Sequence, residues 1–262
     1  MAGLMAGSSM RPGVGALRVW RRDFESWKRF SASFLVASLG NPIFYLASIG
    51  YGLGRFVAKI DGLPYAVFLT PGILATAAMN SASFETTFGS FTRLHEQNTY
   101  AAILATPCSV ADIVAGDILW AATKSALAVF FVLIVTGTAG LLPSPLAIGT
   151  LPVAFLSGLT FAALGMIATA RAGSYSFFDY YFTLGISLMV FFCGVFFPLE
   201  SLPTWAQAVA WFLPLTHAVR LSRALVAGTP SAGMAGDAAW LVVVSLAGFM
   251  VAERLVRRRL IL

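Results

Sequence analysis

Charged residues are scarce in this chain. They make up 11% of its 262 residues, whereas a soluble globular domain carries roughly 25%. Hydrophobic residues reach 58% and the mean hydropathy is +0.83. This composition excludes an ordinary soluble domain and predicts an all-α integral membrane protein.

The side chains that most often perform catalysis are also few. Cys108 and Cys193 lie far apart without a CxxC pair, which argues against a disulfide framework and a zinc site. We expect His95 and His217 on opposite membrane faces, so a histidine-paired nucleophile is not expected. No lysine completes the GxxxxGK[ST] motif, so the chain is not expected to hydrolyse ATP. We expect no catalytic residue, no metal ion and no cofactor bound by this chain.

The net charge of +6 does not indicate nucleic-acid binding, because most basic residues flank apolar runs. Twelve Lys and Arg residues fall on one predicted side of the membrane and four on the other. The positive-inside rule then places both termini in the cytoplasm.

The N-terminal region divides in two. Residues 1–15 are small and rich in Gly and predict a disordered tail. Residues 16–31 predict an amphipathic helix lying in the membrane interface, with Leu17, Trp20, Phe24 and Trp27 on its apolar stripe. Its opposite face is basic and carries Arg18, Arg21, Arg22, Lys28 and Arg29. A soluble surface helix would need a soluble core to pack on, and this chain offers none.

Residues 33–262 predict a transmembrane domain, because about 20 apolar residues cross a bilayer. The six expected spans are Ser33–Gly54, Tyr65–Phe84, Ala111–Gly137, Pro145–Ala170, Phe177–Pro198 and Gly236–Ala252.

The external segment 199–228 is cut by prolines into two apolar helices too short to span. We expect both helices to re-enter the outer leaflet. Their polar edge comprises Glu200, His217, Arg220 and Arg223. The segment either lines an exit from the membrane or only caps the bundle, and the sequence leaves both readings open.

Charged residues within spans are the default functional candidates, because a charge in hydrocarbon is costly. Ser109 and Asp112 predict a capping box that opens the third span. Lys124 is expected to point into the bundle and to pair with Asp117, Glu85 or a neighbouring subunit. Asp179 is the remaining candidate. These charges either contact substrate or lock helices together.

Between the second and third spans lies a polar segment, residues 86–107, that keeps helical periodicity. We expect a helix that lies across the cytoplasmic membrane face and contacts a partner outside the bilayer.

The order of these elements, with Leu94-His-Glu-Gln-Asn-Thr-Tyr-Ala-Ala-Ile-Leu-Ala-Thr-Pro107 and Gly194-Val-Phe-Phe-Pro-Leu-Glu-Ser-Leu-Pro203, resembles the permeases of type 2 ABC exporters (ABC-2). Phe84–Arg93 and Leu119–Lys124 look most like the nodulation protein J subgroup, which exports lipo-chitooligosaccharide with a separate ATPase. The run Asn98-Thr-Tyr-Ala departs from relatives that carry an acidic residue after Thr.

The resemblance implies a permease of the bacterial inner membrane that works as a dimer with a cytosolic ATPase, which holds ATP and Mg. Its substrate would be an amphiphilic glycan, a lipo-oligosaccharide or a related lipid or drug. Residues 86–107 would be the coupling helix. Its polar contacts would be Arg93, His95, Glu96 and Thr99, and its anchors Phe91, Leu94 and Tyr100. The basic helix with Trp20 and Trp27 would be a gate helix beside the ATPase.

Two other functions remain open. An ion-driven secondary transporter would show inverted repeats, and we find no convincing repeat between the halves. A membrane-embedded enzyme acting on lipid headgroups would show clustered carboxylates or histidines at one interface, and the sequence lacks such a cluster.

Overall fold

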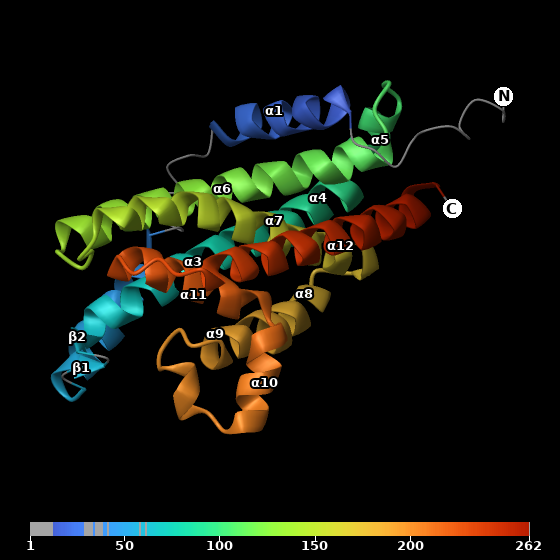
Figure 1. The fold of residues 1–262 in the computed structure, drawn as a ribbon. Helices are drawn as coiled ribbons and strands as arrows, with labels where there is room; N and C mark the ends of the chain where they lie inside the picture. Colours follow the sequence, from blue (N-terminus) through green and yellow to red (C-terminus); the bar gives the residue numbers. More distant parts are fainter. Residues whose placement is uncertain are drawn as a thin grey trace.

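The computed structural model describes residues 13–28, 34, 39–40, 42–57, 59–60 and 62–261. The helices and strands, in chain order, are α1 (Val14–Lys28), η1 (Leu46–Gly52), η2 (Leu53–Arg55), β1 (Lys59–Ile60), β2 (Leu63–Pro64), α3 (Tyr65–Phe84), η3 (Glu85–Gly89), α4 (Ser90–His95), α5 (Thr99–Leu104), α6 (Val110–Thr138), η4 (Pro145–Gly149), α7 (Thr150–Arg171), α8 (Phe177–Tyr180), η5 (Tyr181–Ser187), α9 (Leu188–Phe192), η6 (Leu199–Ser201), α10 (Thr204–Phe212), α11 (Pro214–Ala227) and α12 (Gly233–Ile261). They form a bundle of long helices with α1 and α5 on one side and the short helices α8, α9 and α10 on the other (Figure 1), which confirms the predicted all-α class.

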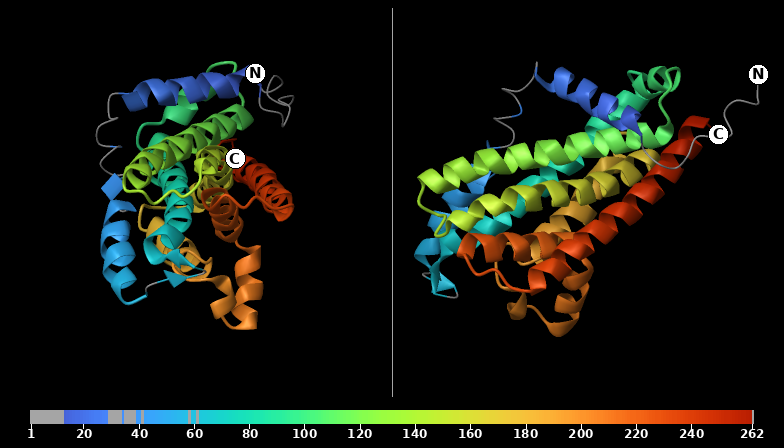
Figure 2. Two further views of the ribbon diagram at one scale, coloured as in Figure 1. Left: turned by 60° about the vertical axis from the view of Figure 1, so that its left-hand side comes forward. Right: turned by 45° about the horizontal axis from the view of Figure 1, so that its top comes forward.

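Helix α3 lies at the centre of the bundle and packs on α6, α7 and α11 (Figure 2). Its sequence is apolar on every side, as expected for a helix surrounded by other helices. Two of its buried hydroxyls bond within the helix: Thr70 and Thr76 donate to the carbonyls four residues earlier. The helix that leads to the functional site is therefore enclosed by protein rather than by lipid.

Four helical segments are long and apolar enough to cross a membrane: Tyr65–His95, Val110–Thr138, Pro145–Arg171 and Gly233–Leu260. They match four of the six predicted spans, and the Ser109–Asp112 capping box is present at the start of α6. The predicted span Phe177–Pro198 is a shorter apolar helix that ends at Phe192. The predicted span Ser33–Gly54 lies partly outside the described residues, so the count of six stays a prediction.

One local expectation needs correction at the N-terminal side, and one feature there was not predicted. Helix α1 begins at Val14, two residues inside the expected disordered tail; residues 1–12 of that tail, and residues 29–31 with Arg29, lie outside the described residues. A two-stranded hairpin, β1 with β2, interrupts the otherwise helical chain, and Gly62 in its turn adopts a φ of 78°.

The segment between α9 and α12 contains the two short helices that the prolines predicted. Pro214 occupies the first turn of α11, where its missing N–H costs nothing. Gly228 ends α11 in the left-handed region, with a φ of 72°. Both helices lie beside the long bundle, and α10 projects furthest from it (Figure 1).

Candidate functional site

The polar segment after α3 is not one helix lying across the membrane face. Its first half extends the α3 helix through the π-helical turn η3 into α4, and the chain then reverses before α5. The reversal occurs at Asn98, which adopts a φ of 50°, a conformation that Asn tolerates better than most residues. Phe91 holds α4 in the bundle by packing on Tyr175 and Phe178, with ring centroids 4.8 and 5.3 Å apart. The expected helix 86–107 is therefore a helical hairpin, which we call the coupling hairpin (residues 86–107).

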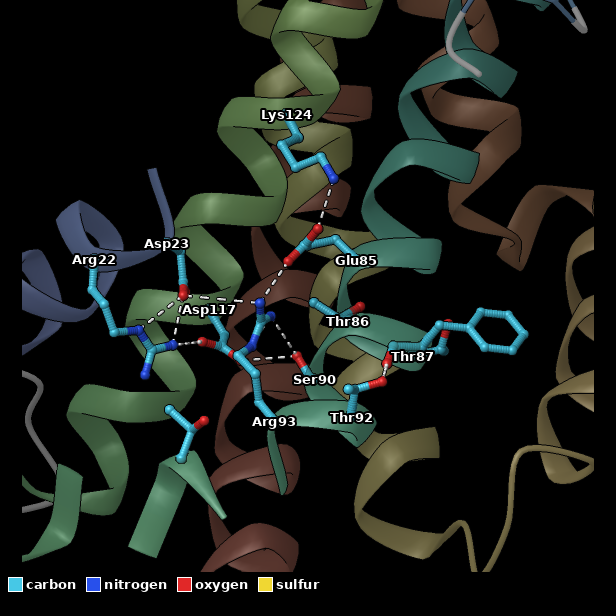
Figure 3. A network of polar contacts seen from close by, with 12 residues as sticks. Arg22, Asp23, Glu85, Thr86, Thr87, Ser90, Thr92, Arg93, Asp117 and Lys124 are labelled. Atoms are coloured by element: carbon cyan, nitrogen blue, oxygen red, sulfur yellow. Dashed lines mark hydrogen bonds and ion pairs between the residues drawn. The ribbon is translucent and has the colours of Figure 1, made fainter. Parts of the chain in front are cut away.

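Arg93 on α4 is the centre of a buried network of charges (Figure 3). Its Nη1 lies 2.9 Å from Glu85 Oε1, and its Nη2 lies 3.3 Å from Asp117 Oδ2. The same Nη1 is 3.9 Å from Asp23 Oδ1 on α1. One guanidinium thus faces carboxylates from η3, α6 and α1.

The network continues to both sides of Arg93. Lys124 Nζ donates to Glu85 Oε2 at 2.7 Å, so the predicted pairing of Lys124 with Glu85 is confirmed. On the other side, the Arg22 guanidinium donates to Asp23 and lies 4.0 Å from Asp117. Asp117 also accepts hydrogen bonds from the hydroxyls of Ser90 and Tyr100. We call these eight residues the ion network: Arg22, Asp23, Glu85, Ser90, Arg93, Tyr100, Asp117 and Lys124.

The ion network balances three cations against three carboxylates at little solvent exposure. The exposed fractions of the Arg93, Glu85 and Asp117 side chains are 14%, 10% and 0%. On α1, outside the spans, burial and the neighbouring Asp117 raise the pKa of Asp23 to about 7, despite the opposing effect of Arg93 and Arg22. The charge on Asp23 therefore changes near neutral pH.

Helix α1 packs along the first half of α6. The Trp20 indole donates to Thr123 Oγ1 at 3.0 Å, and Phe24 and Trp27 pack on Trp120. At its start, the amides of Gly13 and Ala16 donate to Asp112, the cap of α6. The apolar stripe that was expected to face the membrane interface therefore covers a helix with its aromatic residues, and Leu17 is the stripe residue left exposed.

The sequence reasoning missed Asp23. This residue is three positions after Trp20 and four before Trp27, so it lies on the apolar stripe and not on the basic face. A lone acid on the apolar side of an amphipathic helix is costly unless a cation lies opposite, and that was the signal available. Of the predicted gate-helix residues, Arg18, Arg21 and Lys28 are exposed, and Arg22 joins the ion network.

The predicted ATPase contacts separate into two groups. His95 and Glu96 are exposed and Thr99 is half-buried, so these three are placed at the tip of the coupling hairpin. Phe91, Leu94 and Tyr100 are buried inside the chain, and Arg93 belongs to the ion network. The predicted anchors Phe91, Leu94 and Tyr100 are therefore not on the surface, because their side chains pack against other helices of the same chain.

The residues predicted at the polar edge of the external segment also fall into two groups. His217 is buried, with Nδ1 2.7 Å from Asp237 Oδ1 and Nε2 2.7 Å from the Trp211 carbonyl, so it fastens α11 to α12 and α10. Glu200, Arg220 and Arg223 line a cavity beside α10 and α11. Asp179 is exposed on α8 and takes no part in the ion network.

Known proteins resemble this chain over most of its length. A profile described as ABC-2 type transporter matches residues 16–226, from α1 through α11. Nodulation protein J of Rhizobium leguminosarum bv. viciae is 40% identical, covering 95% of this chain and 96% of its own. The proteins of that name from Rhizobium meliloti and Bradyrhizobium diazoefficiens are 38% and 36% identical, and each alignment covers 93% of both chains. The chain is a multi-pass membrane protein and belongs to the ABC-2 type transporter family.

Proposed function

We propose that this chain is the permease subunit of an ATP-driven exporter and that two copies work with a separate cytosolic ATPase, which binds ATP and Mg. The substrate is an amphiphilic glycan or lipo-oligosaccharide taken from the cytoplasm or the inner leaflet. In this proposal the permease lies in the bacterial inner membrane with both termini in the cytoplasm. This choice of substrate class follows the resemblance of Phe84–Arg93 and Leu119–Lys124 to the nodulation protein J subgroup.

The observation that carries the mechanism is the ion network between the coupling hairpin, α1 and α6. The exposed tip of the hairpin, His95 to Thr99, is the part available to an ATPase. Arg93 and Tyr100 lie on the two arms of that hairpin, and both bond to Asp117 of α6. A force on the tip therefore reaches α6 directly through both arms.

The same network extends to α1, through Asp23 and Arg22. We infer that movement of the hairpin shifts α1 relative to α6, which opens and closes the cytoplasmic side of the substrate path. The exposed basic residues Arg18 and Arg21 remain available to lipid headgroups or to the polar end of the substrate.

Reconstitution tests the proposal. The chain is co-expressed with a candidate ATPase subunit, placed in proteoliposomes, and supplied with a fluorescent N-acylated oligosaccharide. We expect transport that requires ATP and both subunits and that ceases when the Walker lysine of the ATPase is replaced. Transport driven by an ion gradient without ATP would instead indicate a secondary transporter, and turnover of lipid by the chain alone would indicate an enzyme.

A further inference from the structure

A cavity of about 540 Å³ opens between the segment around Glu200 and helices α10 and α11. Its polar and aromatic lining comprises Glu200, Gln207, Trp211, Thr216, Arg220 and Arg223. We call it the external pocket. Its volume falls within the range of small-molecule sites, roughly 300–1,000 Å³.

The external pocket and the ion network lie at opposite ends of the bundle. The guanidinium of Arg223 lies over the Phe68 ring, 4.2 Å from its centroid, near the start of α3. Glu85 follows the last residue of the same helix. At 1.5 Å per residue, Phe68 and Glu85 are about 26 Å apart along the axis, which approaches the hydrocarbon thickness of about 30 Å. If the ion network faces the cytoplasm, the external pocket faces outward.

Helix α10 presents three different faces. Ala206 and Ala210 are buried against the protein. Gln207 and Trp211, one turn apart, line the external pocket. Trp205, Val209 and Phe212 share the remaining face and are exposed by 69%, 56% and 64%. A short helix with such an exposed apolar face is suited to the membrane boundary, so the external pocket opens beside lipid.

Gln207, Trp211 and Arg220 of the lining are held in place before any ligand arrives. Gln207 donates to the Leu202 carbonyl at 2.8 Å, and Arg220 lies 3.5 Å from Asp237. Trp211 packs on Trp240 and His217, yet 47% of its surface stays exposed. The lining of the external pocket thus combines an aromatic ring with a carboxylate, an amide and guanidinium groups.

These groups suit a sugar better than an anion. A sugar ring has an apolar face that can lie on an indole, and its hydroxyls both donate and accept hydrogen bonds. Glu200 supplies an acceptor, whereas Arg220 is already beside Asp237 and Arg223 already donates to the Gly194 carbonyl at 2.8 Å. With Arg220 beside Asp237, the charge of Glu200 offsets that of Arg223, so the lining offers an anionic ligand no net positive charge.

We propose that the external pocket binds a sugar unit of the exported amphiphile as it leaves the bundle, with its acyl chain along Trp205, Val209 and Phe212. This inference rests on the proposed function, because it assumes a glycan substrate. It makes the external helices a release site for the headgroup rather than only a cap on the bundle.

Binding to the full chain, with its ATPase, in lipid nanodiscs tests the inference. The probe is the unacylated tetramer of N-acetylglucosamine, and its affinity is measured by isothermal titration calorimetry. We expect Trp211→Ala to weaken binding about tenfold, a loss of the size that an aromatic contact supplies. The matched control is Phe130→Ala on α6, which removes an exposed ring far along the chain from the external pocket.

Two further variants guard against misfolding of Trp211→Ala. Trp211→Phe keeps an aromatic ring and is expected to retain most of the affinity, and Glu200→Gln is expected to weaken binding without disturbing the packed rings. An acylated form of the probe is expected to bind more tightly than the unacylated tetramer. Trp205→Ala is expected to reduce that gain in affinity and to leave binding of the unacylated tetramer unchanged. Equal binding by the Trp211→Ala and Phe130→Ala proteins would overturn the proposal, as would binding of phosphate or citrate in place of the oligosaccharide.

The two proposals fail in different ways. If ATP-driven export proceeds and Trp211→Ala changes neither export nor oligosaccharide binding, the external pocket is not a release site. If the oligosaccharide binds and Trp211→Ala weakens that binding, but no form of the complex exports an acylated glycan, the proposed export function is wrong. The external pocket is then still a sugar-binding site.

Discussion

Replacing Glu85 by Gln is expected to destabilise the protein more than replacing Lys124 by Met. Glu85 accepts from Lys124 at 2.7 Å and from Arg93 at 2.9 Å, so it serves two cations. The substituted amide offers the two cations only a neutral acceptor, and the other charge-stabilising contact of Lys124 in the described part of the chain is the Phe34 ring, whose centroid is 4.9 Å from Nζ. The loss of Lys124 instead leaves Glu85 paired with Arg93.

The expected loss of stability on replacing Glu85 follows from the burial of the ion pair. Removing one partner of a buried ion pair costs about 3–5 kcal/mol, and the side chains of Glu85 and Lys124 are exposed by only 10% and 16%. For a domain of this size, 1 kcal/mol shifts the melting temperature by roughly 2–4 °C, so Glu85→Gln should lower it by roughly 6–20 °C. Lys124→Met should cost less than half as much, because Glu85 keeps a partner.

Thermal unfolding of the detergent-solubilised single and double variants measures both effects. In the double variant neither Glu85 nor Lys124 is left as an unpaired charge, so its loss should be smaller than the sum of the two single losses. Equal losses in the two single variants, or a strictly additive double variant, would refute the idea that Glu85 bridges the two cations.

Three further outcomes are expected. A raised pKa in a docked acid means that docking favours the protonated form, so the docking of α1 should weaken as pH rises through the Asp23 pKa of about 7. Trypsin cleavage at Arg18 and Arg21, normalised to a free peptide, should therefore be faster at pH 8.5 than at pH 6, and Asp23→Asn should abolish that difference. Glu96→Lys should reduce co-purification of the ATPase about tenfold, a change of 1.4 kcal/mol, with an unchanged melting temperature, whereas Arg93→Gln should lower both; an unaltered complex with Glu96→Lys would remove the hairpin tip from the interface. Gly158→Ala should destabilise by about 1–3 kcal/mol, because its Cβ would lie 2.7 Å from the Ala122 Cα, while Gly236→Ala, with no atom within 4 Å, serves as the matched control in the same unfolding assay.

Element boundaries could be predicted where local chemistry decides them. The run from Tyr65 to Phe84 was predicted as a span with the bounds that α3 has. The start of α6 followed from the Ser109–Asp112 capping box, and the short helices α10 and α11 followed from the prolines between them. In each case the signal lies within a few residues of the boundary.

The partners of the charges could be predicted only in part. The pairing of Lys124 with Glu85 was among the expected pairs, since few acids share its depth in the membrane. The contacts of Arg93 could not be predicted, because they depend on α4 continuing α3 into the bundle rather than lying across the membrane face. What packs against the aromatic stripe of α1 was also ambiguous, because such a stripe has the same sequence pattern whether lipid or another helix lies against it.

Stability alone does not explain why six charged groups meet inside this bundle. A buried ion pair is often no more stabilising than apolar side chains of the same volume, and α1 could have been held on α6 by its aromatic residues alone. Apolar packing, however, offers one close-fitting arrangement, whereas the Arg93 guanidinium faces three carboxylates on three elements. Its Nη1 is 2.9 Å from Glu85 and 3.9 Å from Asp23, so a shift of about an ångström exchanges one partner for the other. Movement of the coupling hairpin toward α1 favours Asp23 as the partner of Arg93, and movement away from α1 favours Glu85. The ion network therefore allows a small displacement at the hairpin tip to change how firmly α1 is held, which a purely apolar contact would not.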